Sequence, residues 1–134
     1  MKKDIPEYIV ENIAVAIVKE EDETAGNMWN VYLLNLKKEQ IEGVLVTSTG
    51  YGTINDEATK TSTLRHFLDI MPANSFSKIE PIMENVFGLN NEYWVSFYIN
   101  KTMYDKKYIF LPDSIRKEHL VKIPLINKKG ILIM

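Results

Sequence analysis

Apolar and polar residues alternate along most of this chain in short runs that are separated by turns. The clearest run, WNVYLLNL at 29–36, is apolar on both sides of an extended strand: Trp29, Val31 and Leu33 point one way, and Tyr32, Leu34 and Leu36 the other. Successive side chains of a strand alternate between its two faces. A strand that is apolar on both faces is typical of the middle of a sheet or of the space between two layers, so we expect 29–36 to be central.

Further runs rich in β-branched and aromatic residues predict more strands. They lie at 13–19, 41–48, 76–83, 92–99, 108–111, 120–126 and 131–134, with turn-forming residues between them. In 92–99 (EYWVSFYI), Tyr93 and Val95 point to one side of the strand, and Trp94 and Tyr98 point to the other. We expect this strand in the core. Pro124 removes a backbone donor and predicts that 120–126 lies at a sheet edge.

The segment 58–71 fits two structures. Its apolar residues recur at i, i+3, i+4 and i+7 from Leu64 to Met71, as in an amphipathic helix, but its threonine-rich start and the alternation from Leu64 to Ile70 fit a strand. We favour the strand, because a turn at 71–75 and a second alternating run at 76–83 follow it. A long helix here would overturn an all-β fold.

The segment 48–53 (STGYGT) brackets Tyr51 with two glycines. Glycine adopts backbone conformations that other residues avoid, so this pattern predicts a tight, irregular loop after strand 41–48, with Tyr51 exposed. Further along, Asp113 or Ser114 is a suitable cap for one helical turn at 115–119.

Seven or eight short strands with little helix between them predict an all-β fold. We expect a two-sheet antiparallel sandwich with a short C-terminal extension from 112 onward. At 134 residues, with 46% hydrophobic and 25% charged residues, the chain fits a single soluble domain over 1–134. No apolar run reaches the roughly 18 residues of a membrane span. Asp4, Glu7 and Glu11 interrupt a signal-peptide core, so we expect a cytoplasmic protein without a membrane partner.

The order of three segments resembles the middle of immunoglobulin-like bacterial modules. The segments are VYLLN at 31–35, IEGVLVTS at 41–48 and LDIMPANSFSKIEPI at 68–82, within a resemblance that covers 29–99. In such modules an Asn ends one strand, an "i.nv.v" strand follows, and an "lg.l.pg.s" turn leads into the next. This chain has Ala73-Asn74 where glycine is expected, lacks the cysteine pair, and continues with 112–134. The resemblance implies an immunoglobulin-like sandwich with a scaffold or adhesion-like role.

The chain is also similar to short bacterial proteins that carry the label of a phenylalanyl-tRNA synthetase alpha subunit. Its motifs do not support that label. A class II synthetase core is much longer, and the motif that positions ATP has an Arg three residues before a Glu, whereas Arg65 is followed by His66, Phe67 and Leu68. The glycine-rich arginine motif of those enzymes is missing as well.

Charge divides the chain into two parts. Residues 1–100 hold 8 Lys and Arg against 15 Asp and Glu, a net charge of −7, while 101–134 hold 8 against 3, a net charge of +5. A basic strip at 101–129 that includes aromatic residues fits a surface that stacks and neutralises single-stranded nucleic acid. Opposite charges that balance across one folded surface explain the same distribution. Tyr and Trp on strands are also common as core residues and as anchors of protein interfaces.

Few residues are candidates for catalysis. The chain has no cysteine, only two histidines, His66 and His119, and no spacing of a metal, nucleotide or nucleophile motif, so we expect neither cofactor nor metal. Arg65 and His66 would form an acid–base group if Glu80 or Glu84 came close across the sheet. The alternative, which we favour, is an exposed Arg65 paired with Glu80 and a half-buried His66.

We therefore interpret the chain as a non-catalytic protein-interaction or scaffolding module rather than an enzyme. The binding surface would be an exposed sheet edge at 120–134 or the loop at 50–53, and edge pairing would also allow self-association. The first alternative is a nucleic-acid-binding accessory domain that uses the basic strip, and the second is a small enzyme centred on Arg65, His66 and Glu80. The candidate interaction residues are Tyr51, Arg65, His66, Tyr104, Lys106, Lys107, Arg116 and Lys117.

Overall fold

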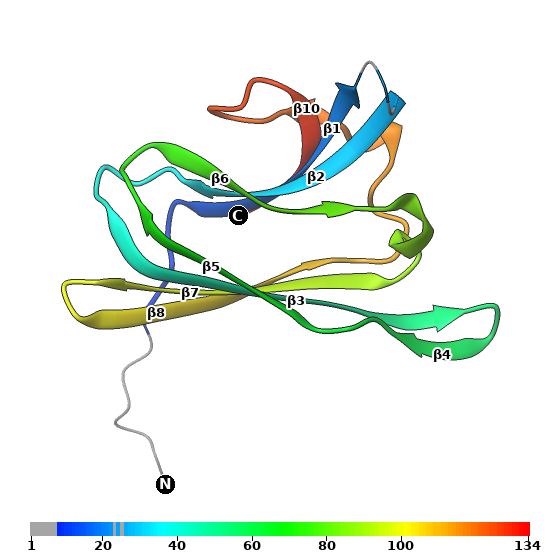
Figure 1. Ribbon diagram of the computed structural model, residues 1–134, viewed down its shortest axis with the longest axis horizontal. Coiled ribbons are helices and arrows are strands. Elements are labelled where there is room, and N and C mark those ends of the chain that lie inside the picture. Colours follow the sequence, from blue (N-terminus) through cyan, green and yellow to red (C-terminus); the bar gives the residue numbers. More distant parts are fainter. Residues whose placement is uncertain (1–7, 23, 25) are drawn as a thin grey trace, which may run out of the picture.

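The computed structural model describes residues 8–22, 24 and 26–134, and strands make up most of that backbone (Figure 1). The strands are β1 (Ile13–Asp22), β2 (Gly26–Asn35), β3 (Ile41–Ile54), β4 (Glu57–Lys60), β5 (Leu64–Met71), β6 (Ser75–Ile82), β7 (Asn90–Ile99), β8 (Thr102–Phe110), β9 (Val121–Lys122) and β10 (Lys129–Ile133). They form two antiparallel sheets that pack face to face, which confirms the predicted all-β sandwich. Asp4 and Glu7, which bear on the expected N-terminus, lie outside the described residues.

Two short 3-10 segments, η1 (Glu84–Val86) and η2 (Lys117–His119), are the helical segments among the described residues. η2 matches the helical turn expected at 115–119. Neither Asp113 nor Ser114 caps it, because the residue at its N-terminal boundary is Arg116, which makes no side-chain capping bond. No helix in the described part of the chain is long and apolar enough to cross a membrane.

The first sheet has the strand order β6-β2-β1-β10-β9. β1 and β2 form a hairpin in which Ile13 pairs with Asn35 and Asp22 with Gly26. β10 pairs with the other side of β1, and β9 pairs with β10 only at Lys129 and Gly130. The sheet edge expected at 120–134 is therefore present but short, because β10 is joined to β1 along most of its length.

The second sheet has the order β4-β3-β7-β8, and β5 also pairs with β3. β3 is its longest strand. β5 lies along the first part of β3, from Ile41 to Ser48, and β4 along the last part, from Tyr51 to Ile54. β7 pairs with the opposite side of β3 over most of its length.

The loop predicted at 48–53 is wrong, because β3 continues through it. Gly50 and Tyr51 pair with Asn91 and Asn90 of β7. The glycine serves close packing instead of a turn: a Cβ on Gly50 would lie 3.0 Å from Cγ2 of Thr61, and the Gly50 amide donates a hydrogen bond to Oγ1 of Thr61 at 2.8 Å. The chain after β4 is thus held against β3.

The segment 64–71 is a strand, as predicted, and not a helix. A helix would have turned Leu64 and Phe67 toward the core together with Met71. In the sheet, Met71 is buried while Phe67 is 67% and Leu64 49% exposed. Asp69, with a φ of 60°, lies where the pairing of β5 with β3 is irregular, so the strand's alternation shifts near its end.

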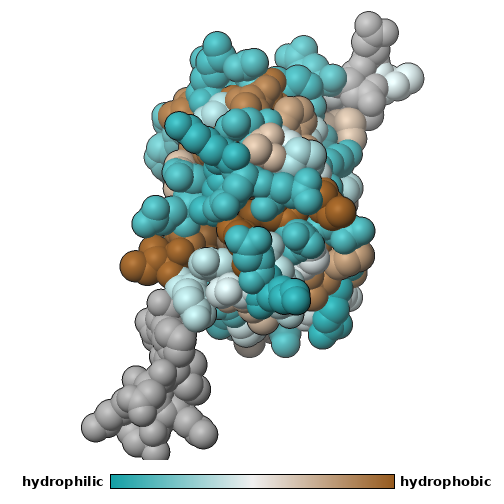
Figure 2. Space-filling view, turned by 90° about the vertical axis from the view of Figure 1, so that its left-hand side faces the viewer, coloured by the Kyte–Doolittle hydropathy of each residue, from teal (hydrophilic) through white to brown (hydrophobic). Residues whose placement is uncertain are grey.

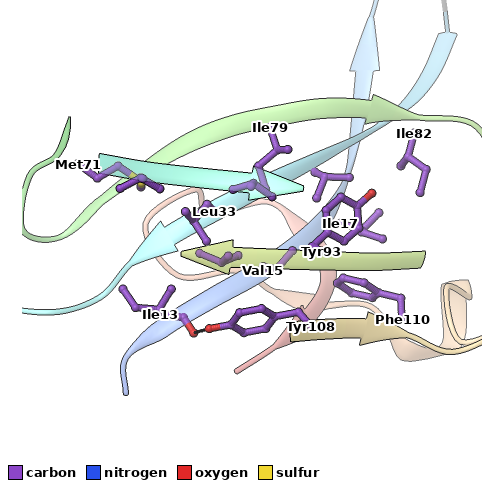
Figure 3. Packing of buried hydrophobic residues seen from close by; sticks show 14 of the residues in the cluster. Ile13, Val15, Ile17, Leu33, Met71, Ile79, Ile82, Tyr93, Tyr108 and Phe110 are labelled. Atoms are coloured by element: carbon purple, nitrogen blue, oxygen red, sulfur yellow. Dashed lines mark hydrogen bonds between the residues drawn. The ribbon is translucent and has the colours of Figure 1, made fainter. Parts of the chain in front are cut away.

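The main core lies between the two sheets (Figure 3). Residues that contribute to it from both sheets include Ile13, Val15, Ile17, Leu33, Met71, Ile79, Ile82, Tyr93, Tyr108 and Phe110. Full burial of such a side chain stabilises a fold by about 1.5–3 kcal/mol. The Tyr108 hydroxyl donates a hydrogen bond to the carbonyl oxygen of Ile13 at 2.6 Å, which satisfies the phenol in the interior and joins the two sheets.

The first sheet is also covered on its outer face. A second, smaller core forms there from Ala14, Ala16, Val18, Leu34 and Ile123. The segment between β9 and β10 crosses this face (Figure 1), and the alanines leave room for it. The prediction that strand 29–36 is buried on both faces is confirmed, since Val31 faces the main core and Leu34 the second core, and both are fully buried.

A polar cluster joins β1, β2 and the turn before β10. Glu20 accepts hydrogen bonds from Asn30 Nδ2 at 2.9 Å and from Tyr32 Oη at 2.6 Å, and it pairs with Lys128. Burial alone would raise the pKa of Glu20, but the hydrogen bonds from Lys128, Tyr32 and Asn30 together outweigh it and lower the pKa. Burial, with the adjacent Glu20 carboxylate, raises the pKa of Tyr32 to about 12.

Gly130 allows β10 to approach β1 closely. A Cβ at this position would lie 2.5 Å from the carbonyl oxygen of Ile17 and 3.0 Å from Cα of Val18. We expect Gly130→Ala to push the strands apart and to lower the free energy of unfolding by about 1–3 kcal/mol. Gly88→Ala is the control, because nothing lies within 4 Å of its added Cβ. Urea denaturation measures both, and equal stability of the two variants would contradict the close approach.

The lowered pKa of Glu20 makes its contribution to stability depend on pH. A carboxylate whose pKa is lower in the folded than in the unfolded chain stabilises the fold above its unfolded pKa, and this stabilisation is lost as the pH falls through the folded pKa. We therefore expect the destabilisation by Glu20→Gln to be largest near neutral pH and to shrink as the pH falls below the ordinary Glu value of 4.5. Urea denaturation of both proteins at several pH values measures it.

The exposed neighbour Glu21 supplies the control variant, Glu21→Gln. This variant should change little at any pH. A destabilisation by Glu20→Gln that stays constant between neutral and acidic pH would show that the hydrogen bonds of Glu20 do not favour its charged form.

Candidate functional site

The outer face of the second sheet carries a group of large apolar side chains. They are Leu45, Phe67, Trp94, Tyr98 and Met103, which we call the aromatic face. Strand pairing brings them together, because Leu45 lies opposite Phe67 and Tyr98 lies opposite Met103. Alternation turns them away from the core residues on the same strands.

No described element covers the aromatic face. Phe67 is 67% exposed, Met103 49%, and Trp94 and Tyr98 43% each. In Figure 1 the strands of the second sheet form the lower layer, and the first sheet packs only above it. By contrast, the end of the sandwich that Figure 2 shows, where the β2–β3 and β7–β8 turns lie, is mostly hydrophilic, with hydrophobic side chains mainly in a band between the layers.

Trp94 is held in place on this face by its neighbours on β8. Its indole Nε1 donates a hydrogen bond to Oδ2 of Asp105 at 3.2 Å. The ammonium of Lys107 lies 4.6 Å from the centre of the ring system, within the range of a cation–π contact. An anchor that is ordered before binding loses less conformational entropy when a partner covers it.

Charged side chains of both signs surround the aromatic residues. Arg65 and Lys107 lie in the same cross-strand row as Trp94, through Thr47. Glu92 lies on the same side of β7 and accepts a hydrogen bond from the Tyr51 hydroxyl at 3.2 Å. The face therefore has an apolar centre with a mixed, nearly balanced set of charges.

A β-bulge turns Glu80 into the sandwich. The register between β2 and β6 shifts, so that Val31 lies opposite Glu80 and Tyr32 opposite Lys78. Ile79 is the extra residue, and it is buried in the main core. A bulge sets two successive residues against one partner residue. Here it brings the carboxylate of Glu80 to the inner face of the sheet.

Three side chains from the second sheet meet this carboxylate, and we call the four residues the Glu80 cluster. Oε1 accepts a hydrogen bond from Ser48 Oγ at 2.8 Å and lies 2.7 Å from His66 Nε2, and Oε2 accepts one from Tyr93 Oη at 3.2 Å. The side chain of Glu80 is 15% exposed and that of His66 25%. Burial, followed by the charge of Glu80, raises the pKa of Tyr93 far above its ordinary value, so its hydroxyl stays a donor at neutral pH.

A cavity of about 380 Å³ lies beside the Glu80 cluster. Ser48, Glu80 and Tyr93 form part of its wall. The segment that precedes β5 and the η1 segment complete it, so the cavity lies where the two sheets separate at one end of the sandwich. Its wall combines hydroxyl and amide groups with aliphatic side chains.

The predicted acid–base group is assembled only in part. His66 contacts Glu80. Arg65, the residue before His66 on β5, lies on the opposite face of the strand and points outward. The favoured alternative expected Arg65 as the partner of Glu80, and this pairing is wrong, because Glu80 contacts His66 instead. His66 is half-buried, as that alternative expected. Ser48 and His66 bond to the same carboxylate oxygen, so the partner of the serine hydroxyl is Glu80. In a catalytic triad the serine hydroxyl bonds to the histidine, so this arrangement is not that of a serine activated by a histidine base.

The remaining candidate interaction residues are dispersed. Those that face outward on the second sheet are Tyr51, Arg65 and Lys107. Tyr104 stacks on Phe97 of the core with ring centroids 5.4 Å apart, and Lys106 lies on the same inner side of β8. Arg116 and Lys117 lie in the segment between β8 and β9.

The basic residues of 101–129 are divided between the two sheets. Lys106 and Lys107 belong to β8 of the second sheet, whereas Lys122 and Lys129 belong to β9 and β10 of the first. Lys128 is paired with Glu20. A strip that is continuous in the sequence thus lies on two layers of the sandwich.

Sequence reasoning misses most of the aromatic face and two members of the Glu80 cluster. For the face a signal exists, because Ser96 lies between Trp94 and Tyr98 on the outer side of β7. For Ser48 and Tyr93 no local signal exists, since only the bulge in β6 brings Glu80 to them.

Within the described residues, no group of three or more His, Asp or Glu side chains is placed to hold a metal ion. Compared with protein-family models, curated proteins and solved structures, the chain matches none of them. Its function is therefore inferred from the aromatic face and the Glu80 cluster.

Removal of the Glu80 carboxylate would leave Ser48, His66 and Tyr93 without their shared acceptor. An unsatisfied buried polar group costs about 1–3 kcal/mol, so we expect Glu80→Ala to lower the free energy of unfolding by at least about that amount. Glu92→Ala is the control, because Glu92 lies on the outer face, and its effect should stay within about 0.5 kcal/mol. Urea denaturation measures both. Equal losses would contradict a special role of Glu80 in joining the sheets.

Proposed function

We propose that this protein is a non-catalytic interaction module that binds a protein partner through its aromatic face. The observation that carries the proposal is the exposure of Phe67, Trp94, Tyr98 and Met103 on one sheet face that no described element covers. Contiguous patches of large exposed apolar side chains commonly mark sites that a partner buries. Trp, Tyr and Arg are also the residues that most often dominate the energetics of protein interfaces.

The charges on the face favour a protein partner over nucleic acid. Arg65 and Lys107 are offset by Glu92 and Asp105 on the same side of the sheet. Binding of a nucleic acid needs an excess of positive charge along the contact surface. An apolar, aromatic centre with a polar rim of both signs is typical of protein interfaces.

We also propose that the sandwich is immunoglobulin-like. In support, the neighbours β1-β2-β6 in one sheet and β3-β7-β8 in the other follow the A-B-E and C-F-G order of immunoglobulin domains. β5 lies beside β3, as the additional strand of variable-type domains lies beside strand C. β9 and β10 then form the C-terminal extension, added on the free side of β1.

The test is a quantitative pull-down with the tagged full chain from the cytoplasmic lysate of its host, at low and high salt. We expect a stoichiometric protein that stays bound at high salt, because apolar contacts are not screened. Trp94→Ala and Phe67→Ser should each reduce its recovery by roughly tenfold or more, since truncation of a central aromatic anchor has effects of this size. Hydrogen exchange of the purified complex should show protection of amides in β7 and β8.

Met83→Ser is the matched control, because Met83 is 70% exposed but lies outside the aromatic face. It should leave recovery unchanged. A purified chain that is dimeric alone and monomeric as Trp94→Ala would identify a second copy as the partner. Recovery of nucleic acid that is lost at high salt, or of a protein that the Trp94 and Phe67 variants retain, would overturn the proposal.

A further inference from the structure

A second site lies on the inner side of the second sheet, at the cavity beside the Glu80 cluster. Its volume of about 380 Å³ falls within the range of small-molecule sites, roughly 300–1,000 Å³. The cavity connects to solvent through its rim, where Ser62 is exposed and Met83 is 70% exposed. The cavity is therefore open to solvent, and a ligand can enter it.

The electrostatics of the cavity favour a cation. Among the described residues that line it, Glu80 is the only one with a charged side chain. The hydrogen-bond partners of this carboxylate are the hydroxyls of Ser48 and Tyr93 and the imidazole of His66, none of which is a permanent cation. A largely buried carboxylate without a Lys or Arg partner is more stable when a positive ligand group lies beside it.

The carboxylate also has an acceptor site left for a ligand. An ionised carboxylate has about four lone-pair sites, two on each oxygen. Ser48 and His66 occupy those of Oε1, while Tyr93 occupies one on Oε2. The Ser48 oxygen, which donates its own proton to Glu80, remains able to accept. An ammonium group carries three N–H donors and matches such a set of acceptors.

The rest of the wall indicates what the ammonium is attached to. Leu64, Ile82 and Val86 present aliphatic surface to the cavity. We propose that the cavity binds a primary ammonium group on a short aliphatic chain, with the ammonium at Glu80 and the chain along these three side chains. A free alkylamine and a lysine side chain of a peptide share this chemistry. Anionic ligands are disfavoured, because Glu80 would repel them.

The probe that tests this site is n-pentylammonium, titrated into the full chain at neutral pH and followed by two-dimensional amide NMR. We expect saturable shifts at 48–50, 61–64 and 80–86. The dissociation constant should be roughly tenfold or more lower than that of 1-pentanol, which has the same chain without the charge. Pentanoate, which carries the opposite charge, should produce no saturable shift.

Two variants locate the binding. Glu80→Gln removes the charge with little change of shape and should weaken pentylammonium binding roughly tenfold or more. Because this variant also perturbs the Glu80 cluster, Ser62→Lys provides a second test, since it places a positive charge at the exposed rim and should weaken binding as well. Thr63→Lys adds the same charge one residue further on, where the side chain bonds to Thr49 instead of lining the cavity. This control should bind normally.

Nα-acetyl-lysine methylamide distinguishes the two sources of the ammonium. Tighter binding of this compound than of pentylammonium would assign the site to a lysine of a peptide, and weaker binding would assign it to a free amine.

The proposal is overturned if pentylammonium gives no saturable shift, if pentanol or pentanoate binds equally well, or if Glu80→Gln and Ser62→Lys both keep the affinity of the Thr63→Lys control. Trp94→Ala, which disrupts the aromatic face, should leave pentylammonium binding unchanged. Failure of the cavity proposal is therefore distinguishable from failure of the proposed function.

Discussion

The rest of the structure depends on the burial of both faces of the β1–β2 hairpin. A sheet with two apolar faces needs two covers. The second sheet covers the inner face, where Val15 and Val31 lie, and the segment between β9 and β10 covers the outer face, where Ala16 and Leu34 lie. The second sheet is covered on its inner face only, and within the described chain its outer face remains open. The aromatic face is the consequence of this asymmetry between the two layers.

β7 separates the two sites that we infer. Tyr93 points inward to Glu80, while the next residue, Trp94, points outward to the aromatic face. The two sites therefore share a strand but not a surface. Since a strand in the middle of a sheet is the most rigid support that this fold offers, both sites are placed on well-ordered backbone.

Much of the fold could be predicted from alternation alone. The doubly apolar run at 29–36 predicts a strand buried on both faces, and the alternation at 64–71 predicts a strand despite its helical spacing. The structure bears out both. Prediction failed where the role of a residue depends on a contact with a distant segment. The glycines at 48–53 predict a loop, but Gly50 lies within β3, where its lack of a side chain lets Thr61 pack closely against the strand.

The candidate sites were less predictable, because each depends on strand pairing. Read as a regular strand, 76–83 places Glu80 on the same side as Lys78, toward solvent. The extra residue at Ile79 reverses that side, and only the pairing of β6 with β2 reveals it. The meeting of His66 with Glu80 could be anticipated from two ionisable residues on neighbouring segments, but the outward turn of Arg65 follows from its register with Thr47.

The position of β10 has a consequence for how the protein is made. Val15 of β1 pairs with Ile133 of β10, 118 positions later in the sequence. While the chain emerges from the ribosome, one side of β1 and the outer face of the hairpin remain uncovered until β10 has been synthesised. Pairings over such long separations form slowly, and exposed strand edges associate with other chains. This sheet can therefore be completed only after β10 has emerged, and a nascent or prematurely terminated chain that lacks β10 is a natural substrate for chaperones and proteases.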